Sequence, residues 1–170
     1  MKNPVFILLW LCLSIGNLGF AQEETKKQQK AERKAELNKE IAQLIDSREY
    51  AFVANTVLPL SLPPINLNPG SADVIFGPEM VTSNLPFFGV AYSGADLSHD
   101  QGMAFSGAPT NYKIKNRKKT YDIEMDIKTD NDSYSLSLSV GLDGNALLTI
   151  SSTHRSDVSY SGNIARIRKE

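Results

Sequence analysis

The second half of the chain alternates strictly between apolar and polar residues, and this pattern restricts its fold more than any other. Tyr121, Ile123, Met125 and Ile127 are separated by charged residues, and the segment from Tyr134 to Val140 repeats the alternation with serine at every second position. Side chains of a β-strand point to opposite faces in turn, so the pattern predicts strands with one face on a core and one in water. A slip of one residue would turn the apolar face outward, so the alternation also fixes the register of an antiparallel sheet.

Turn signals divide the chain into short strands. Asp143-Gly144 is a hairpin signal, because glycine accepts the positive φ that such turns need. Asp130-Asn131-Asp132 resembles the start of a calcium loop but lacks the later glycine and glutamate, so we interpret it as a turn. The predicted strands cover 50–62, 65–67, 73–76, 80–82, 85–92, 112–115, 121–128, 134–140, 146–150 and 158–164. The strands after residue 111 are joined by short turns and are expected to form a meander.

These elements predict an α+β fold that is mainly β. A helix is expected to precede an antiparallel sheet that is curved or partly closed, a barrel-like meander spanning residues 50–170. Many strands with one apolar face must wrap around a core or pack on a helix. A flat sheet covered by a single helix would leave much of that face exposed to water.

The first 49 residues predict an export signal followed by a charged helix. Residues 1–21 combine Lys2, an apolar run and small residues before a cleavage point after Ala21, so we expect a periplasmic or secreted protein. Removal of the signal would leave no membrane span. In the helix at 22–49, an apolar stripe predicts docking on the sheet, while the earlier half is expected to project into solvent. The stripe consists of Leu37, Ile41, Leu44 and Ile45.

Composition excludes several classes of function. Cys12, in the signal, is the only cysteine, so the mature chain has no disulfide and no thiol nucleophile. Loss of Lys2 leaves 17 basic against 19 acidic residues, and this near-balance argues against nucleic acid as a partner. Phosphate-binding loops, nucleophile elbows and zinc motifs are missing from the sequence, so no cofactor is expected.

The most distinctive stretch runs from Leu85 to Gly107 and is rich in aromatic residues and glycine. The segment Leu85–Tyr92 is apolar on both faces, which fits either a central strand of the core or the wall of a binding groove. The candidate binding residues are Phe87, Phe88, Tyr92 and Phe105. Our first hypothesis is therefore a non-enzymatic periplasmic binding or interaction module. The sequence names no partner and leaves open a small apolar ligand, a lipid or an envelope protein.

Two other hypotheses remain open. Asp96, His99 and Asp100 offer groups for a hydrolase or a metal-dependent enzyme, although a solvated polar loop explains the same residues. Alternatively, the protein is a structural envelope component that reaches a partner through the helical segment Gln22–Lys39.

A series of glycine, proline and aromatic motifs carries a family resemblance. The motifs are Leu85 to Gly89, Ala91-Tyr92, Gly102 to Gly107, Asn111-Tyr112, Tyr121, Tyr134, Ser151-Ser152, Arg155, Ser159-Tyr160 and Gly162 to Ile164. They resemble a family of short exported proteins, common in Bacteroidota-type bacteria, known only as a domain of unknown function. The resemblance spans roughly Tyr50 to Ile167, as expected for one domain. It implies an envelope or secreted location and supplies no catalytic residues.

Overall fold

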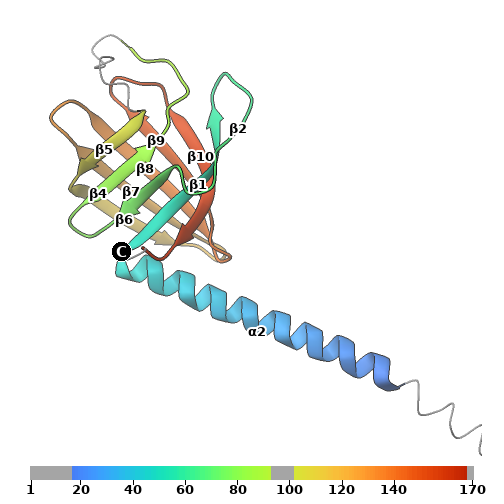
Figure 1. Ribbon diagram of the computed structural model, residues 1–170. Helices are drawn as coiled ribbons and strands as arrows, with labels where there is room; N and C mark the ends of the chain where they lie inside the picture. Colours follow the sequence, from blue (N-terminus) through green and yellow to red (C-terminus); the bar gives the residue numbers. More distant parts are fainter. Residues whose placement is uncertain (1–16, 93–101, 168–170) are drawn as a thin grey trace, which may run out of the picture. The chain divides into compact units, whose positions relative to one another are not determined.

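The computed structural model describes residues 17–92 and 102–167, with side chains from residue 26 onward (Figure 1). The chain divides into two compact units, residues 1–37 and 38–170. The mainly β fold predicted from the sequence is confirmed, since in these described ranges one helix precedes ten antiparallel strands. Among the described residues, no helix has both the length and the apolar character needed to cross a membrane.

The strands form one antiparallel sheet in the order β5-β4-β3-β1-β10-β9-β8-β7-β6, with β2 paired to β1. The bounds are α2 Asn17–Ser47, β1 Tyr50–Pro59, β2 Ile65–Asn66, β3 Asp73–Phe76, β4 Val81–Leu85, β5 Met103–Gly107, β6 Pro109–Asn116, β7 Thr120–Lys128, β8 Ser133–Gly141, β9 Asn145–Ser152 and β10 Val158–Ala165. The expected meander is present from β6 to β10, and β10 then pairs with β1.

The sheet curls until its two edge strands, β5 and β6, approach each other (Figure 1). Gly107 at the end of β5 lies so close to β7 that a Cβ atom there would stand 2.7 Å from Cγ2 of Ile127. Closing a sheet in this way removes most of the exposed strand edge that would otherwise invite pairing with other chains.

The predicted alternation fills the interior of this nearly closed barrel. Ile123, Leu138, Leu148 and Ile150 are at most 1% exposed, while the serines between the apolar residues of β8 face outward. Each buried aliphatic side chain stabilises the fold by about 2 kcal/mol.

The strand β6 is an edge of the sheet, so its apolar face is only partly covered. Tyr112 is half-buried and Ile114 is 42% exposed, although the alternation predicts both side chains on the core face. Ile114 pairs directly with the buried Ile123, and paired residues of neighbouring strands point to the same face, so Ile114 does lie on the predicted face. One extra residue enters β6 opposite β7 between Thr110 and Lys113, which forms a β-bulge.

The end of α2 closes one end of the sheet. Ile41, Leu44 and Ile45 are buried, as the apolar stripe predicts, whereas Leu37 is 38% exposed. Gly144 in the β8–β9 hairpin has a φ of 81°, and a Cβ atom there would lie 3.0 Å from Cδ1 of Ile41. The side chains of residues 26–37 are exposed.

The predicted strand at Leu85–Tyr92 is wrong. The strand β4 ends at Leu85, and in the segment that follows only Ala91 forms a bridge, to Arg155. Pro86 has no N–H to donate to a ladder, which explains why pairing ends there. The segment 86–92 is therefore a connection that crosses the end of the sheet opposite α2 (Figure 1).

Gly162 allows the close approach of β10 to β1. The register shifts between Ala54 and Thr56, and a Cβ atom at position 162 would overlap the carbonyl oxygen of Val53. A backbone atom cannot move aside as the end of a flexible side chain can.

We expect Gly162→Ala to lower the free energy of unfolding by about 1–3 kcal/mol, the usual effect of overpacking. Urea denaturation followed by circular dichroism measures this change. Ser161→Ala, at the exposed neighbouring position of β10, serves as the control and should change stability by less than about 0.5 kcal/mol. Equal midpoints for both variants would contradict this account of Gly162.

Candidate functional site

An open groove of about 530 Å³ lies at the end of the sheet opposite α2. Its walls come from β2 and the turn after it, from the end of β4, and from the start of the 86–92 segment. The lining residues are Ile65, Asn66, Leu67, Asn68, Ser71, Asn84, Leu85, Pro86, Phe87, Phe88 and Gly102. A concave surface that combines aromatic rings with a few polar groups is the usual form of a small-molecule site.

The lining of the groove includes two aromatic rings and three side-chain amides. Phe87 and Phe88 are half-buried and pack against the core, so part of each ring remains accessible. Asn66, Asn68 and Asn84 are exposed, and each amide offers both donors and acceptors of hydrogen bonds. The arrangement suits a ligand with an apolar face and several polar groups.

Two side chains from the β9–β10 region fix the start of the 86–92 segment. The Tyr160 hydroxyl donates a hydrogen bond of 2.8 Å to the carbonyl oxygen of Pro86. Nη1 of Arg155 donates one of 2.7 Å to the carbonyl oxygen of Gly102, and the same guanidinium lies 5.2 Å from the centre of the Phe87 ring. Burial raises the pKa of Tyr160 well above its ordinary value, against the opposing effect of Arg155. The phenol therefore stays protonated and keeps donating.

Backbone contacts with residues 154–156 hold the rest of the segment. The Val90 N–H donates to Oγ of Ser156 at 3.1 Å, and the Ser156 N–H donates back to the Val90 carbonyl at 2.9 Å. The Tyr92 N–H donates to the carbonyl of His154 at 2.8 Å. A Cβ atom on Gly89 would lie 2.5 Å from Oγ of Ser156, so a larger residue there would displace the Ser156 side chain. The wall of the groove is thus held in place without a ligand.

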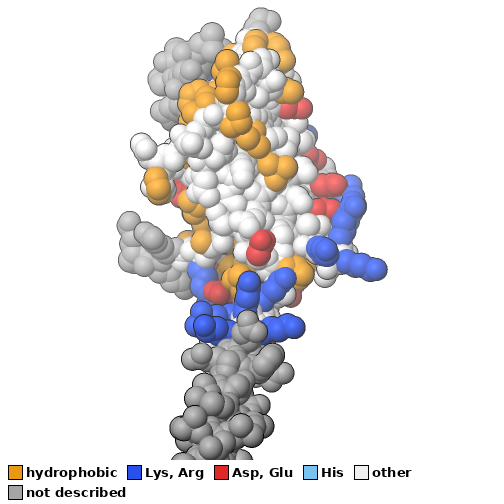
Figure 2. Space-filling model, turned by 90° about the vertical axis from the view of Figure 1, so that its right-hand side faces the viewer, with side chains coloured by type: hydrophobic (Ala, Val, Ile, Leu, Met, Phe, Trp, Pro, Cys, Tyr) orange, Lys and Arg blue, Asp and Glu red, His pale blue; other side chains and the backbone are white. Residues whose placement is uncertain are grey.

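Large apolar side chains are exposed around the same end of the sheet. Leu60, Leu62, Val90 and Tyr92 are 76%, 55%, 60% and 52% exposed. Figure 2 shows hydrophobic side chains gathered in the upper part of the face that it displays. Contiguous exposed apolar surface is uncommon on monomeric proteins and marks sites of interaction.

The structure separates the four candidate binding residues. Phe87 and Phe88 line the groove, and Tyr92 lies exposed beyond it. Phe105 is 8% exposed and stacks on Tyr134 with ring centres 4.2 Å apart, so it belongs to the core.

The residues of the alternative enzymatic hypothesis, Asp96, His99 and Asp100, lie outside the described residues. Within the described ranges, no group of three or more histidine, cysteine, aspartate or glutamate side chains could hold a metal ion.

The predicted turn at 130–132 is confirmed. There the Asp132 carboxylate accepts hydrogen bonds from Oγ of Ser152 and from the backbone N–H of Thr153.

No signal in the sequence marks the asparagines of the groove as parts of one site. Asn66, Asn68 and Asn84 come from β2, the turn after it and β4, and no spacing along the chain marks them as neighbours. The pairing of β1 with β2 and β3, and of β3 with β4, brings these elements together.

We expect Tyr160→Phe to loosen the 86–92 segment, because the Pro86 carbonyl loses its donor. One hydrogen bond corresponds to about a tenfold change in local opening, so the Val90 and Tyr92 amides should exchange hydrogen about tenfold faster. Hydrogen exchange followed by NMR measures this rate. Tyr121→Phe, which removes a phenol from β7, should leave both amides unchanged, and equal protection in the two variants would argue against the role of Tyr160.

Comparison with known proteins agrees with this fold. A family model described as a domain of unknown function, DUF4251, matches residues 32–164. The crystal structure of a DUF4251 family protein from Bacteroides eggerthii DSM 20697 is similar with a TM-score of 0.62 and 17% identity, over 76% of this chain and 87% of that one. Identity at this level supports the fold alone. A comparison with curated proteins finds no match. The family resemblance seen in the sequence is thus confirmed, and the chain belongs to the DUF4251 family.

Proposed function

We propose that this protein is an exported, non-enzymatic binding module, and that the groove beside Phe87 and Phe88 holds a small amphipathic molecule of the cell envelope. One observation carries the proposal: the lining of the groove combines accessible aromatic rings with three exposed asparagine side chains. Burying an apolar group on the rings provides affinity, while the amides orient the polar part of the ligand.

The fixed wall of the groove supports this function. The Tyr160 hydroxyl donates a hydrogen bond to Pro86, and Oγ of Ser156 accepts one from Val90, so the 86–92 segment is held at two points along its length. A wall that is already ordered loses little conformational entropy when a ligand binds, which favours affinity.

The groove should bind an uncharged apolar probe. We expect the fluorescence of N-phenyl-1-naphthylamine to rise on addition of the full chain, and Phe88→Ala to weaken its binding about tenfold, because a large apolar contact is lost. Ile114→Ala is the matched control, since it removes an exposed apolar side chain from β6, outside the groove.

Polar recognition is tested with a second ligand. Asn84→Leu should weaken displacement of the probe by a lysophospholipid and leave binding of the probe itself unchanged, because the probe has no hydroxyl or phosphate for the amide to bind. Equal probe binding by the wild type and Phe88→Ala would contradict the proposed site. A partner protein that protects Leu60 and Leu62, with no displacement by lipid, would instead favour an interaction module.

Export is the second part of the proposal and rests on the signal pattern of residues 1–21. In cells that express the full chain, we expect the mass of the protein in the periplasmic fraction or the medium to match a chain that begins at Gln22. Ala21→Arg, which places a large charged residue at the cleavage site, should retain the precursor. Recovery of the uncleaved wild-type chain from the cytoplasmic fraction would contradict export.

A further inference from the structure

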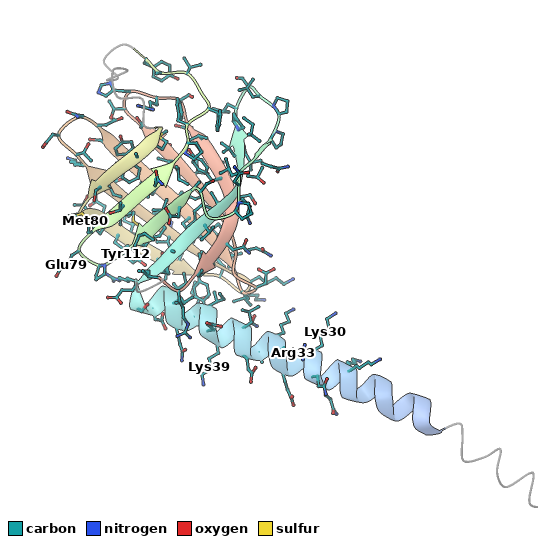
Figure 3. All side chains as sticks on the ribbon, in the orientation of Figure 1. Lys30, Arg33, Lys39, Glu79, Met80 and Tyr112 are labelled. Carbon is teal, nitrogen blue, oxygen red and sulfur yellow. The ribbon has the colours of Figure 1, made fainter. Side chains whose placement is uncertain are left out.

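A second, more enclosed cavity of about 60 Å³ lies where α2 joins the sheet. Its apolar lining includes Phe76, Val81 and Met125, and its polar lining consists of Arg48, Tyr50 and Tyr112. Figure 3 shows Tyr112 beside the β3–β4 turn that carries Glu79 and Met80, and Pro78 of that turn lines the same cavity. The cavity thus lies at the seam of the barrel, the place where the edge strand β6 approaches β3 and β4.

Two phenol hydroxyls are buried here without partners. Tyr50 is 1% exposed, Tyr112 is half-buried, and neither hydroxyl has a hydrogen-bond partner among the described residues. A buried hydroxyl that remains unpaired is destabilising, so such groups are normally satisfied by protein, water or ligand. Burial raises the pKa of both phenols, so both are protonated at neutral pH and are available as donors.

Arg48 adds a positive charge to the two donors. Its guanidinium carbon lies 4.2 Å from the centre of the Tyr112 ring. Contact with a ring face is electrostatic and does not consume the guanidinium's N–H groups, which can bind a carboxylate. Asp46 also acts on Tyr112, and its negative charge favours a ligand with a single negative charge over one with two.

Backbone strain is concentrated around the same cavity. In residues 17–92 and 102–167, the only non-glycine residues with positive φ are Arg48, at 57°, and Asn111, at 53°. Arg48 occupies the position just after α2, where glycine would be the easier choice. Asn111 lies in the β6 bulge, next to Tyr112. Strained residues persist where the surrounding structure holds them, and they cluster at ligand sites.

We propose that this cavity binds a small aliphatic monocarboxylate, with the carboxylate between Arg48, Tyr50 and Tyr112 and the aliphatic tail against Val81 and Met125. All three polar groups can donate hydrogen bonds, and one of them carries a positive charge, which matches a carboxylate. The apolar wall excludes a ligand that is hydrated on all sides. This site is separate from the aromatic groove, and its ligand does not depend on the function proposed there.

Butyrate is the probe, and butyramide is its uncharged counterpart of the same size. In NMR titrations of the full chain, butyrate should shift the signals of the Met125 methyl group and the Val81 methyl groups saturably. Tyr112→Phe and Arg48→Gly should each weaken binding about tenfold or more, the usual effect of removing one hydrogen bond to a charged group. Butyramide should bind the wild type more weakly than butyrate by a similar factor.

Both variants should fold, which keeps the test decisive. Tyr112→Phe removes a hydroxyl that has no partner, and glycine at position 48 relieves a positive φ, so neither should lower the urea midpoint. Arg166→Gly removes another arginine, one paired with Glu40, and should leave butyrate binding unchanged. Shifts that do not saturate, shifts equal for butyrate and butyramide, or equal affinity in wild type and Arg48→Gly would each overturn the proposal. So would ordered water on both phenols that butyrate does not displace.

Discussion

The pairing of β1 with β10 holds the two halves of the sheet together. It runs from Ala51 opposite Ala165 to Pro59 opposite Val158 and joins the meander β6–β10 to the strands β3, β4 and β5. These strands are distant in sequence, so the contact must offset a large loop-closure entropy before the interior can be filled. Gly162 is critical for this reason, because a side chain there would meet the backbone of β1.

Closure of the sheet decides where function can reside. The interior is occupied by buried side chains such as Phe52, Ile123 and Leu148, each fully buried. Side chains fill a small barrel, so ligand sites fall at its ends and seams. The aromatic groove lies at one end, and the cavity lined by Arg48, Tyr50 and Tyr112 lies at the other, beside the end of α2. The two sites therefore share no lining residue and can be tested independently.

The sequence predicted the regular part of this fold well and its connections poorly. Strict alternation identified β7 and β8, because a single face of each strand is buried and a slip in register would expose it. The same reasoning failed at Leu85–Tyr92, where aromatic residues suggested a strand. The segment instead packs on the sheet through contacts of Phe87 with Arg155 and of Pro86 with Tyr160, which lie about seventy residues away in the sequence.

The residues of the candidate sites were harder still to predict from the sequence. Phe87 and Phe88 were found because aromatic residues are visible in a sequence, but Asn84 and Asn66 become candidates only once the fold places both in the lining of one groove. The cavity at Tyr50 and Tyr112 was missed because each residue looks like an ordinary member of an apolar strand face. What distinguishes them is the bulge at Asn111 and the positive φ of Arg48, and local pattern predicts neither. Strain of this kind opposes folding, so its position beside two unpaired hydroxyls is better explained by a ligand than by stability.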